Sequence, residues 1–364
     1  MNLQETSKRL REALSRYGNI LILIKGSPDP DVIASSFALK AVCDHLKIRS
    51  SMVALSEISH PQNRAIVKAL DIPLEIEKSL PSRHGFDAYA VLDFQSAYTR
   101  GLSEKLPCAV HIDHHAETHD DVNADFRLVS DRAGAASTYM ALILRELDLP
   151  PAGPVRRAVS TALMLGIQTD TDNLHHATRL DYEALQYLSG KADQGIIQKV
   201  YSVPLSEEAL RMIGAAMSDH ELYRDWFLAG LSFIAETQRD SIAIVADFLL
   251  ESGVAETVVV FAIIEKKRQG GLSLDVSFRT SNPDLDLNAL IKSITPDGGG
   301  RAYKGAYQVS LDYFAAFPDR EALWTIVRVT TIERLKAARD NVRFTEIRGF
   351  YRRIRGRIEN LFGG

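Results

Sequence analysis

Acidic and imidazole side chains recur directly after several apolar runs in the first half of the chain. They are Asp29 and Asp31 after LILIKGSP, Asp93 after AYAVL, Asp113, His114 and His115 at the end of CAVHI, and Asp170 after ALMLGIQ. Carboxylates gathered at this density repel one another unless a cation lies among them. Carboxylate and imidazole ligands together suit Mn²⁺, with Mg²⁺ or Co²⁺ as alternatives. The set therefore predicts a site for a divalent metal ion.

Each of these residues also has an ordinary structural explanation. A single aspartate after a strand is more often a helix cap or a turn residue than a ligand. Asp29 and Asp31, with Lys25 close by in the sequence, could form a loop whose charges neutralise one another. The joint occurrence of such residues after several strands favours the metal site.

The elements that must position these residues follow from the apolar periodicity. We expect helices at 3–17 and 32–47, and strands at 19–24, 51–55, 86–92 and 107–112. Strands that alternate with helices predict an α/β fold, with a parallel sheet covered by helices on both faces. Ligands bind beyond the carboxyl ends of the strands in such sheets, which is where the acidic residues fall.

The pattern of predicted elements changes after this region. Residues 133–217 are almost entirely helical in pattern, and strands return at 226–234, 256–264 and 272–279, with helices at 240–252 and 284–294. This indicates a second, smaller α+β domain. The predicted divisions are a first domain at 1–190, a helical connector at 191–218, a second domain at 219–340 and a basic C-terminal tail at 341–364.

Composition and targeting signals fit a soluble protein of the cytoplasm. The 364 residues are 46% hydrophobic and 25% charged, which is typical of a globular chain. Two cysteines, Cys43 and Cys108, argue against a disulfide framework and for a reducing compartment. The charged N-terminus does not resemble a signal peptide. Acidic residues interrupt the apolar stretch 242–264, so we expect no membrane span.

The charge is unevenly distributed. A net charge of −4 predicts no general affinity for nucleic acid, but nine basic residues stand against four acidic ones between 332 and 361. The simpler interpretation is the solvated face of a terminal helix. The alternative is that these basic residues attract a polyanionic substrate or a membrane surface electrostatically.

Taken together, these residues resemble a known family. "PDPD" at 28–31, "LD" at 92–93, "DHH" at 113–115 and "GIQTDTD" at 166–172 are similar to the four ordered motifs of the DHH phosphoesterase superfamily. The stretch DVSFRTSNPDLDLNALIKSITPDGGGR, 275–301, resembles the DHHA1 domain that follows in some members. The resemblance covers about residues 15–312, in the family's order.

The resemblance implies roles for individual residues. It implies metal ligands at Asp29 for a first ion, at Asp31, His114 and Asp170 for a second, and at Asp93 as a bridge. It makes Asp113 a residue that orients a histidine, and His115 a contact to the reacting phosphate. In the second domain it implies substrate contacts from Arg279, from the backbone amides of Gly298, Gly299 and Gly300, and from Arg301, which replaces the family's histidine.

The implied activity is hydrolysis of phosphoesters or phosphoanhydrides with one or two Mn²⁺ ions. Short oligonucleotides or nucleotide phosphates are the expected substrates, and a homodimer is a candidate assembly. The alternatives are a pyrophosphate or polyphosphate hydrolase, and a weakened or inactive member that binds a nucleotide or phosphorylated ligand.

Lys25 is the main departure from the family's pattern, because it stands where a metal-binding histidine is expected. A protonated lysine has no lone pair for a metal. Three explanations compete: Lys25 acts in catalysis beside a weakened or absent first metal, it points away while two metals bind, or catalysis is lost.

Overall fold

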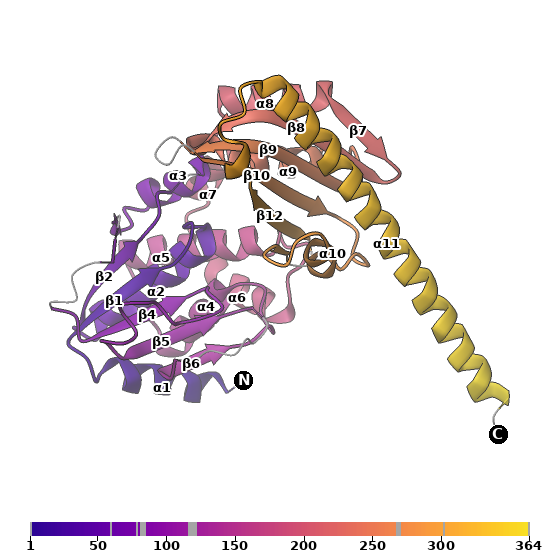
Figure 1. Cartoon of the computed structure of the whole chain (residues 1–364). Coiled ribbons are helices and arrows are strands. Elements are labelled where there is room, and N and C mark those ends of the chain that lie inside the picture. The colour runs from indigo at the N-terminus through magenta and orange to yellow at the C-terminus, as the bar shows by residue number, and fades with distance from the viewer. Residues whose placement is uncertain are drawn as a thin grey trace. The chain divides into compact units, whose positions relative to one another are not determined.

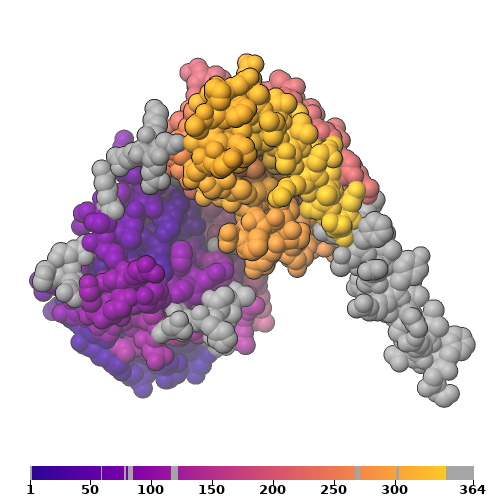
Figure 2. Space-filling model, in the orientation of Figure 1, coloured from indigo at the N-terminus to yellow at the C-terminus, as the bar shows by residue number. Residues whose placement is uncertain are grey.

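The computed structural model describes residues 2–362, apart from 59, 78, 81–84, 116–121, 267–270 and 301–302, and describes side chains only up to 341. Figure 2 shows the described surface in colour. The contacts divide the chain into two compact units, Met1–Val203 and Pro204–Gly364. The division falls inside the connector predicted at 191–218, and the finer boundaries stay predictions.

A six-stranded parallel sheet forms the centre of the first unit (Figure 1). Its strands are β1 (Asn19–Ile24), β2 (Arg49–Ala54), β3 (Leu74–Ile76), β4 (Ala88–Leu92), β5 (Cys108–Asp113) and β6 (Ala124–Val129). They lie in the order β3-β2-β1-β4-β5-β6, so β1 and β4 are neighbours. The order reverses between these two strands, which is where α/β sheets place their ligands.

The helices of the first unit pack on one face of this sheet. They are α1 (Leu3–Leu14), α2 (Pro30–His45), α3 (Pro61–Ala69), α4 (Ala136–Leu147), α5 (Pro154–Asp170), α6 (Arg179–Ser189) and α7 (Gln194–Tyr201). Alternate strand residues such as Ile20, Ile22 and Ala90 join them in one core.

The opposite face of the sheet has a different cover. Its residues, such as Leu21 and Leu23, pack with Ala97 and Leu102 from the connection between β4 and β5, and no described helix contributes a buried residue to this core. The expectation of helices on both faces is therefore wrong for the described part of the sheet. The physical reason is that turns, rather than a helix, make this connection.

The second unit is a mostly antiparallel sheet between two helical layers. Its strands are β7 (His220–Tyr223), β8 (Trp226–Ala235), β9 (Thr257–Lys266), β10 (Gly271–Thr280), β11 (Gly299–Gly300) and β12 (Lys304–Ser310). Its helices are α8 (Glu207–Ser218), α9 (Ser241–Glu251), α10 (Leu287–Ile294) and α11 (Arg320–Phe362). Helices α8 and α9 pack on one face, and α10 and α11 on the other.

The α/β fold class and the main elements are confirmed. The sequence did not predict the short strands β3, β7, β11 and β12, nor α3 and β6. Both cysteines are buried and free, in accordance with the expected absence of a disulfide framework. Among the described helices, none combines the length and the apolar character that a bilayer crossing requires.

Candidate metal centre

The segment from Asp29 to Asp31 is first of all a helix start. Asp29 is the N-cap of α2, and its Oδ1 accepts a hydrogen bond of 3.0 Å from the amide of Val32. Pro30 takes the first helical position, where its missing N–H costs nothing, and Asp31 adds a negative charge to the first turn. The structural explanation and the ligand role are thus compatible in the same residues.

Asp31 is fully buried and joins α2 to the start of α4. Its two carboxylate oxygens accept hydrogen bonds of 2.7 Å from the amides of Ala136 and Ser137. These amides belong to the N-terminus of α4, which lacks a side-chain cap of its own. Each carboxylate oxygen keeps a further lone pair, so Asp31 can serve the helix and a metal ion together.

Gly166 allows α5 to approach this point. A Cβ atom at Gly166 would lie 2.4 Å from Ser137 Oγ and 3.2 Å from the Cα of Asp31, so only glycine fits. Asp170 lies four residues later on α5 and hence on the same face of the helix. The glycine of the fourth motif therefore brings the aspartate of that motif close to Asp31.

Four residues converge at this site: Asp31 from the first turn of α2, Asp93 and His114 from the ends of β4 and β5, and Asp170 from α5. The ligand atoms of Asp31, Asp93, His114 and Asp170 all lie within 4.8 Å of one another. His114 Nε2 is 2.8 Å from Asp170 Oδ2 and 3.2 Å from Asp93 Oδ1. A second such group joins Asp93, His114 and His115. Asp93 and His114 are common to both groups, whereas Asp29 is in neither.

His115 and Asp113 form a pair beside the cluster. His115 Nδ1 is 2.6 Å from Asp113 Oδ1 and 3.9 Å from Asp93 Oδ1. Burial by itself raises the pKa of Asp113, but the hydrogen bond from His115 and its charge lower it overall. An ionised Asp113 accepts the Nδ1 proton and leaves the other ring nitrogen, Nε2, for a further partner.

Burial and the neighbouring charges shift the pKa values of the residues in this cluster. Burial, and then the charge of Asp170, raise the pKa of Asp31 to about 6. Burial and the charges of Asp29 and Asp31 raise the pKa of Asp93 well above its usual range. Burial alone would lower the pKa of His114, yet close contacts with the carboxylates of Asp170 and Asp93 raise it to about 11. Without a metal, an imidazolium at His114 supplies positive charge to the carboxylates.

The donor set fits a divalent cation. Asp93 Oδ1 and His114 Nε2 are buried and, within the described part of the chain, make no hydrogen bond of good geometry. Three carboxylates and one imidazole offer the oxygen-rich set that suits Mn²⁺ or Mg²⁺. The buried acidic groups would be strongly repulsive together unless a cation or protons neutralised them.

Lys25 follows the last residue of β1 and is engaged by the connection after β4. Its Nζ donates hydrogen bonds of 2.8 Å to the carbonyl of Ser96 and 2.7 Å to that of Tyr98. It also lies 4.3 Å from the centroid of the Phe94 ring. These contacts give Lys25 a structural role that the sequence did not predict.

In the second unit, Arg279 is buried and its donors are engaged. It makes a two-point ion pair with Asp247 of α9, and its Nη1 donates to Ser277 Oγ and to the carbonyl of Phe278, both at 2.9 Å. A phosphate at Arg279 would have to share or displace the Asp247 carboxylate. Its substrate role stays a prediction.

The glycine triplet packs closely under α10. A Cβ atom at Gly298 would lie 2.6 Å from Ile291 Cγ2 and 2.8 Å from the Cβ of Tyr307. Gly299 and Gly300 form β11 and pair with β12. Packing therefore accounts for Gly298, and a role of the triplet in phosphate binding stays a prediction. Arg301 lies outside the described residues.

Two buried polar residues of the first unit were missed from the sequence. Asp181, at the start of α6, accepts hydrogen bonds from the amides of Gly134 and Thr178 and from the hydroxyl of Thr138. His111, inside β5, contacts the carbonyl of Phe94. The histidine within the apolar strand CAVHI was the available signal, whereas Asp181 had none because its partners are distant in the sequence.

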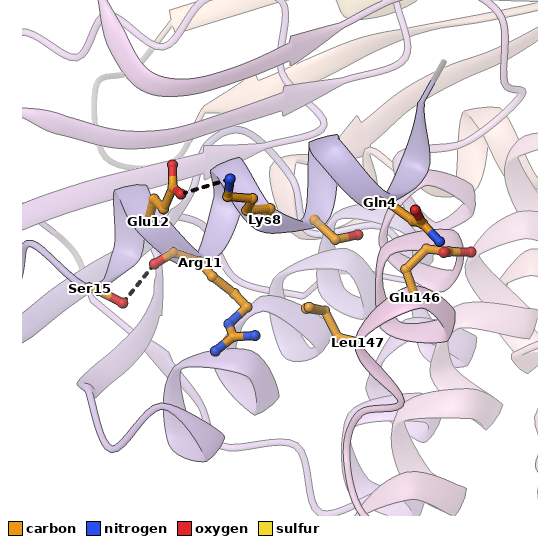
Figure 3. Close-up of a pocket in the computed structure, with 8 residues that line it drawn as sticks. Gln4, Lys8, Arg11, Glu12, Ser15, Glu146 and Leu147 are labelled. Atoms are coloured by element: carbon orange, nitrogen blue, oxygen red, sulfur yellow. Dashed lines mark hydrogen bonds and ion pairs between the residues drawn. The ribbon is translucent and has the colours of Figure 1, made fainter.

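A separate hollow of about 740 Å³ lies over α1 and the end of α4 (Figure 3). Its lining includes Lys8, Arg11, Glu12 and Glu146, and none of the predicted site residues. Positive and negative side chains are mixed in its lining, so the hollow has no electrostatic preference for an anionic or a cationic ligand.

Comparisons with known proteins show relatives over most of the chain. No family model matches the sequence. The uncharacterized protein MJ1633 of Methanocaldococcus jannaschii is 30% identical over 330 residues, which cover 90% of this chain and 64% of that protein. A second protein of that organism, MJ0988, is 29% identical over 183 residues, 49% of this chain and 53% of its own. The chain thus spans less than two thirds of the length of either relative.

A solved structure shows the fold. An exopolyphosphatase-related protein from Bacteroides fragilis superposes with a TM-score of 0.66 at 16% identity, over 93% of this chain and 98% of that one. The match extends over most of both units. The chain therefore shares its two-unit fold with this exopolyphosphatase-related protein.

Proposed function

We propose that the chain is a metal-dependent phosphoesterase that hydrolyses short oligonucleotides or nucleotide phosphates. The observation that carries this proposal is the convergence of Asp31, Asp93, His114 and Asp170 within 4.8 Å at the carboxyl edge of the sheet. Such buried carboxylates suit catalysis by a divalent ion at a position where open α/β sheets bind ligands.

A divalent ion held there supplies positive charge for phosphoryl oxygens and makes water more acidic. The chain's own residues prepare the rest of the site. Asp113 holds His115 through Nδ1, so that Nε2 can contact a phosphate oxygen. Asp31 is fixed by two amides of α4, which keeps its carboxylate in one orientation. We infer Mn²⁺ as the preferred ion, with Mg²⁺ or Co²⁺ as substitutes.

The number of ions is part of the proposal. Asp31, Asp93, His114 and Asp170 form a complete set for one ion, and this supports at least single occupancy. A second ion would use Asp29 and the shared Asp93. Asp29 already accepts a hydrogen bond from Val32 with Oδ1, so a second ion would be bound more weakly.

A second candidate activity is hydrolysis of pyrophosphate or polyphosphate. The name of the Bacteroides fragilis neighbour, exopolyphosphatase-related, supports this alternative. The hairpin of β11 and β12 beneath α10, with the resemblance of 275–301 to DHHA1, favours nucleotide substrates. A chain that binds a phosphorylated ligand without turnover is the third candidate, suggested by Lys25.

The experiment is metal analysis of the purified chain together with a hydrolysis screen in Mn²⁺. The substrates are di- to pentanucleotides, 3′-phosphoadenosine 5′-phosphate, cyclic dinucleotides, pyrophosphate and tripolyphosphate. We expect turnover of the short nucleotides, lost in Asp93→Asn and kept in Asp44→Asn, whose carboxylate is on the exposed side of α2. No turnover of any substrate, with no bound metal, would rule out the enzyme. Light scattering tests the predicted homodimer.

A further inference from the structure

The end of β4 needs support, because Asp93 adopts an unfavourable backbone conformation. Its φ is +50°, in the left-handed region, which a residue other than glycine keeps only where the surrounding structure fixes it. Asp93 is also shared by both groups of ligand atoms. Whatever holds the segment after Asp93 therefore also fixes the carboxylate that both groups share.

Lys25 is placed to hold this segment. In the parallel pairing of β1 and β4, Leu23 lies opposite Val91, so Lys25 and Asp93 follow two residues later on each strand. The Lys25 ammonium donates to the carbonyls of Ser96 and Tyr98 and lies over the Phe94 ring. One side chain thereby contacts three residues among the five that follow Asp93.

His111 holds the same segment from β5. Its side chain is fully buried, and Nε2 lies 2.9 Å from the carbonyl oxygen of Phe94. Because a carbonyl only accepts, Nε2 carries the proton. The amide of Asp93 donates to the carbonyl of Ile112 at 2.8 Å. Asp93 and the residue after it are thus tied to β5, while the following residues are tied to Lys25.

We propose that Lys25 and His111 are positioning residues that clamp segment 94–98 and so hold the Asp93 carboxylate in the geometry that binds the metal. This inference rests on the proposed metal site. It gives the lysine a function that needs neither a lone pair nor contact with the substrate.

Charge and clamping predict opposite effects on metal affinity. A positive charge near the cluster opposes a cation, so removing the ammonium would strengthen metal binding if charge decided. If the clamp decides, removing it frees segment 94–98 and weakens binding. Residues that orient metal ligands typically contribute about 10- to 100-fold in affinity.

The test measures Mn²⁺ binding to the full chain by calorimetry. Lys25→Met keeps a long apolar side chain but removes the three donors, and we expect about tenfold weaker binding or more. Lys25→Arg restores donors and should bind within about threefold of the unaltered chain. The matched control is Lys40→Met. Lys40 likewise donates two hydrogen bonds, to the carboxylate of Asp44 and the carbonyl of Ser50, and it lies outside the site.

The second arm separates positioning from general stability. His111→Gln can still donate to the Phe94 carbonyl, whereas His111→Leu cannot. We expect the visible spectrum of bound Co²⁺, which reports ligand geometry, to change in Lys25→Met and His111→Leu and to be kept in the conservative variants.

Three results would overturn the inference: Mn²⁺ binding by Lys25→Met that is equal to or tighter than that of the unaltered chain, equal losses in Lys40→Met, or an unchanged Co²⁺ spectrum in both disruptive variants. Because these measurements need no substrate, a chain that binds Mn²⁺ but hydrolyses nothing would refute the proposed function while leaving the clamp testable. A chain that binds no Mn²⁺ would refute the metal site and the clamp together.

Discussion

Single residues at the cluster serve the fold and the candidate chemistry together. Asp29 caps α2, Asp31 accepts the first amides of α4, and both lie at the sheet edge where the metal is proposed. The residue types could be predicted from the sequence because the acidic groups follow apolar strands. The engagement of Lys25 by Ser96 and Tyr98 could not, since it depends on how the connection after β4 folds back.

The perturbed pKa values predict that metal binding strengthens as the pH rises. His114, with its pKa raised to about 11, is protonated at neutral pH without a metal, and binding must displace that proton. The raised pKa of Asp31, about 6, acts in the same direction. One displaced proton makes Mn²⁺ affinity rise about tenfold per pH unit. Calorimetry between pH 5.5 and 8 measures this slope.

The same shifts set the stability of the metal-free chain. Both groups have a pKa above the unfolded value, so their contribution to folding stability falls as the pH rises. It falls between about pH 4 and 6 for Asp31 and between about pH 6.5 and 11 for His114. The gain in Tm on adding Mn²⁺ should therefore be larger at pH 8 than at pH 5.5. His114→Gln is the control, since it lacks the titrating ring. A gain that is equal at both pH values would contradict this account.

At the scale of elements, close helix packing brings the proposed ligands together. The contact of α5 with α2 and α4 depends on Gly166, and the sequence showed this glycine only as part of a motif. The strands and long helices could be predicted because their apolar periodicity is strong. Short strands such as β3 and β11 could not be predicted. They contain only three and two residues, too few to show an apolar alternation, and only their pairing with a neighbouring strand defines them.

Gly166→Ala should destabilise the first unit by about 1–3 kcal/mol, the usual cost of overpacking a core. The new methyl group would meet Ser137 Oγ at 2.4 Å, which must shift away from the start of α4. Urea unfolding of the full chain measures the loss, and Mn²⁺ binding should weaken with it because Asp170 lies one turn further on α5.

The double variant Gly166→Ala with Ser137→Ala provides the control. Removing the hydroxyl relieves the shortest contact, so the double variant should be more stable than the sum of the two single effects predicts. The contacts with the backbone of Pro30 and Asp31 remain, so recovery should be incomplete. Strict additivity of the two changes would show that the contact with the Ser137 hydroxyl is not what requires glycine at position 166.

At the scale of the whole molecule, each unit has its own core, and the proposed metal ligands all belong to the first. Residues 1–203 contain the complete sheet, its helices and the cluster of Asp31, Asp93, His114 and Asp170. The predicted substrate contacts, Arg279 and Gly298–Gly300, belong to the second. The sequence predicted this separation of metal binding from substrate binding, because the two sets of motifs lie in two predicted domains with a helical stretch between them.

Residues 1–203, expressed alone, should therefore fold and bind Mn²⁺ with an affinity close to that of the full chain, because no described ligand is missing. Hydrolysis of short nucleotides should fall strongly, since the proposed substrate contacts are absent, and this loss should appear mainly in KM. Arg279→Ala in the full chain is the companion variant and should reproduce part of the rise in KM. Unimpaired hydrolysis by residues 1–203 would mean that the second unit does not bind the substrate, because the first unit then holds every group the reaction needs.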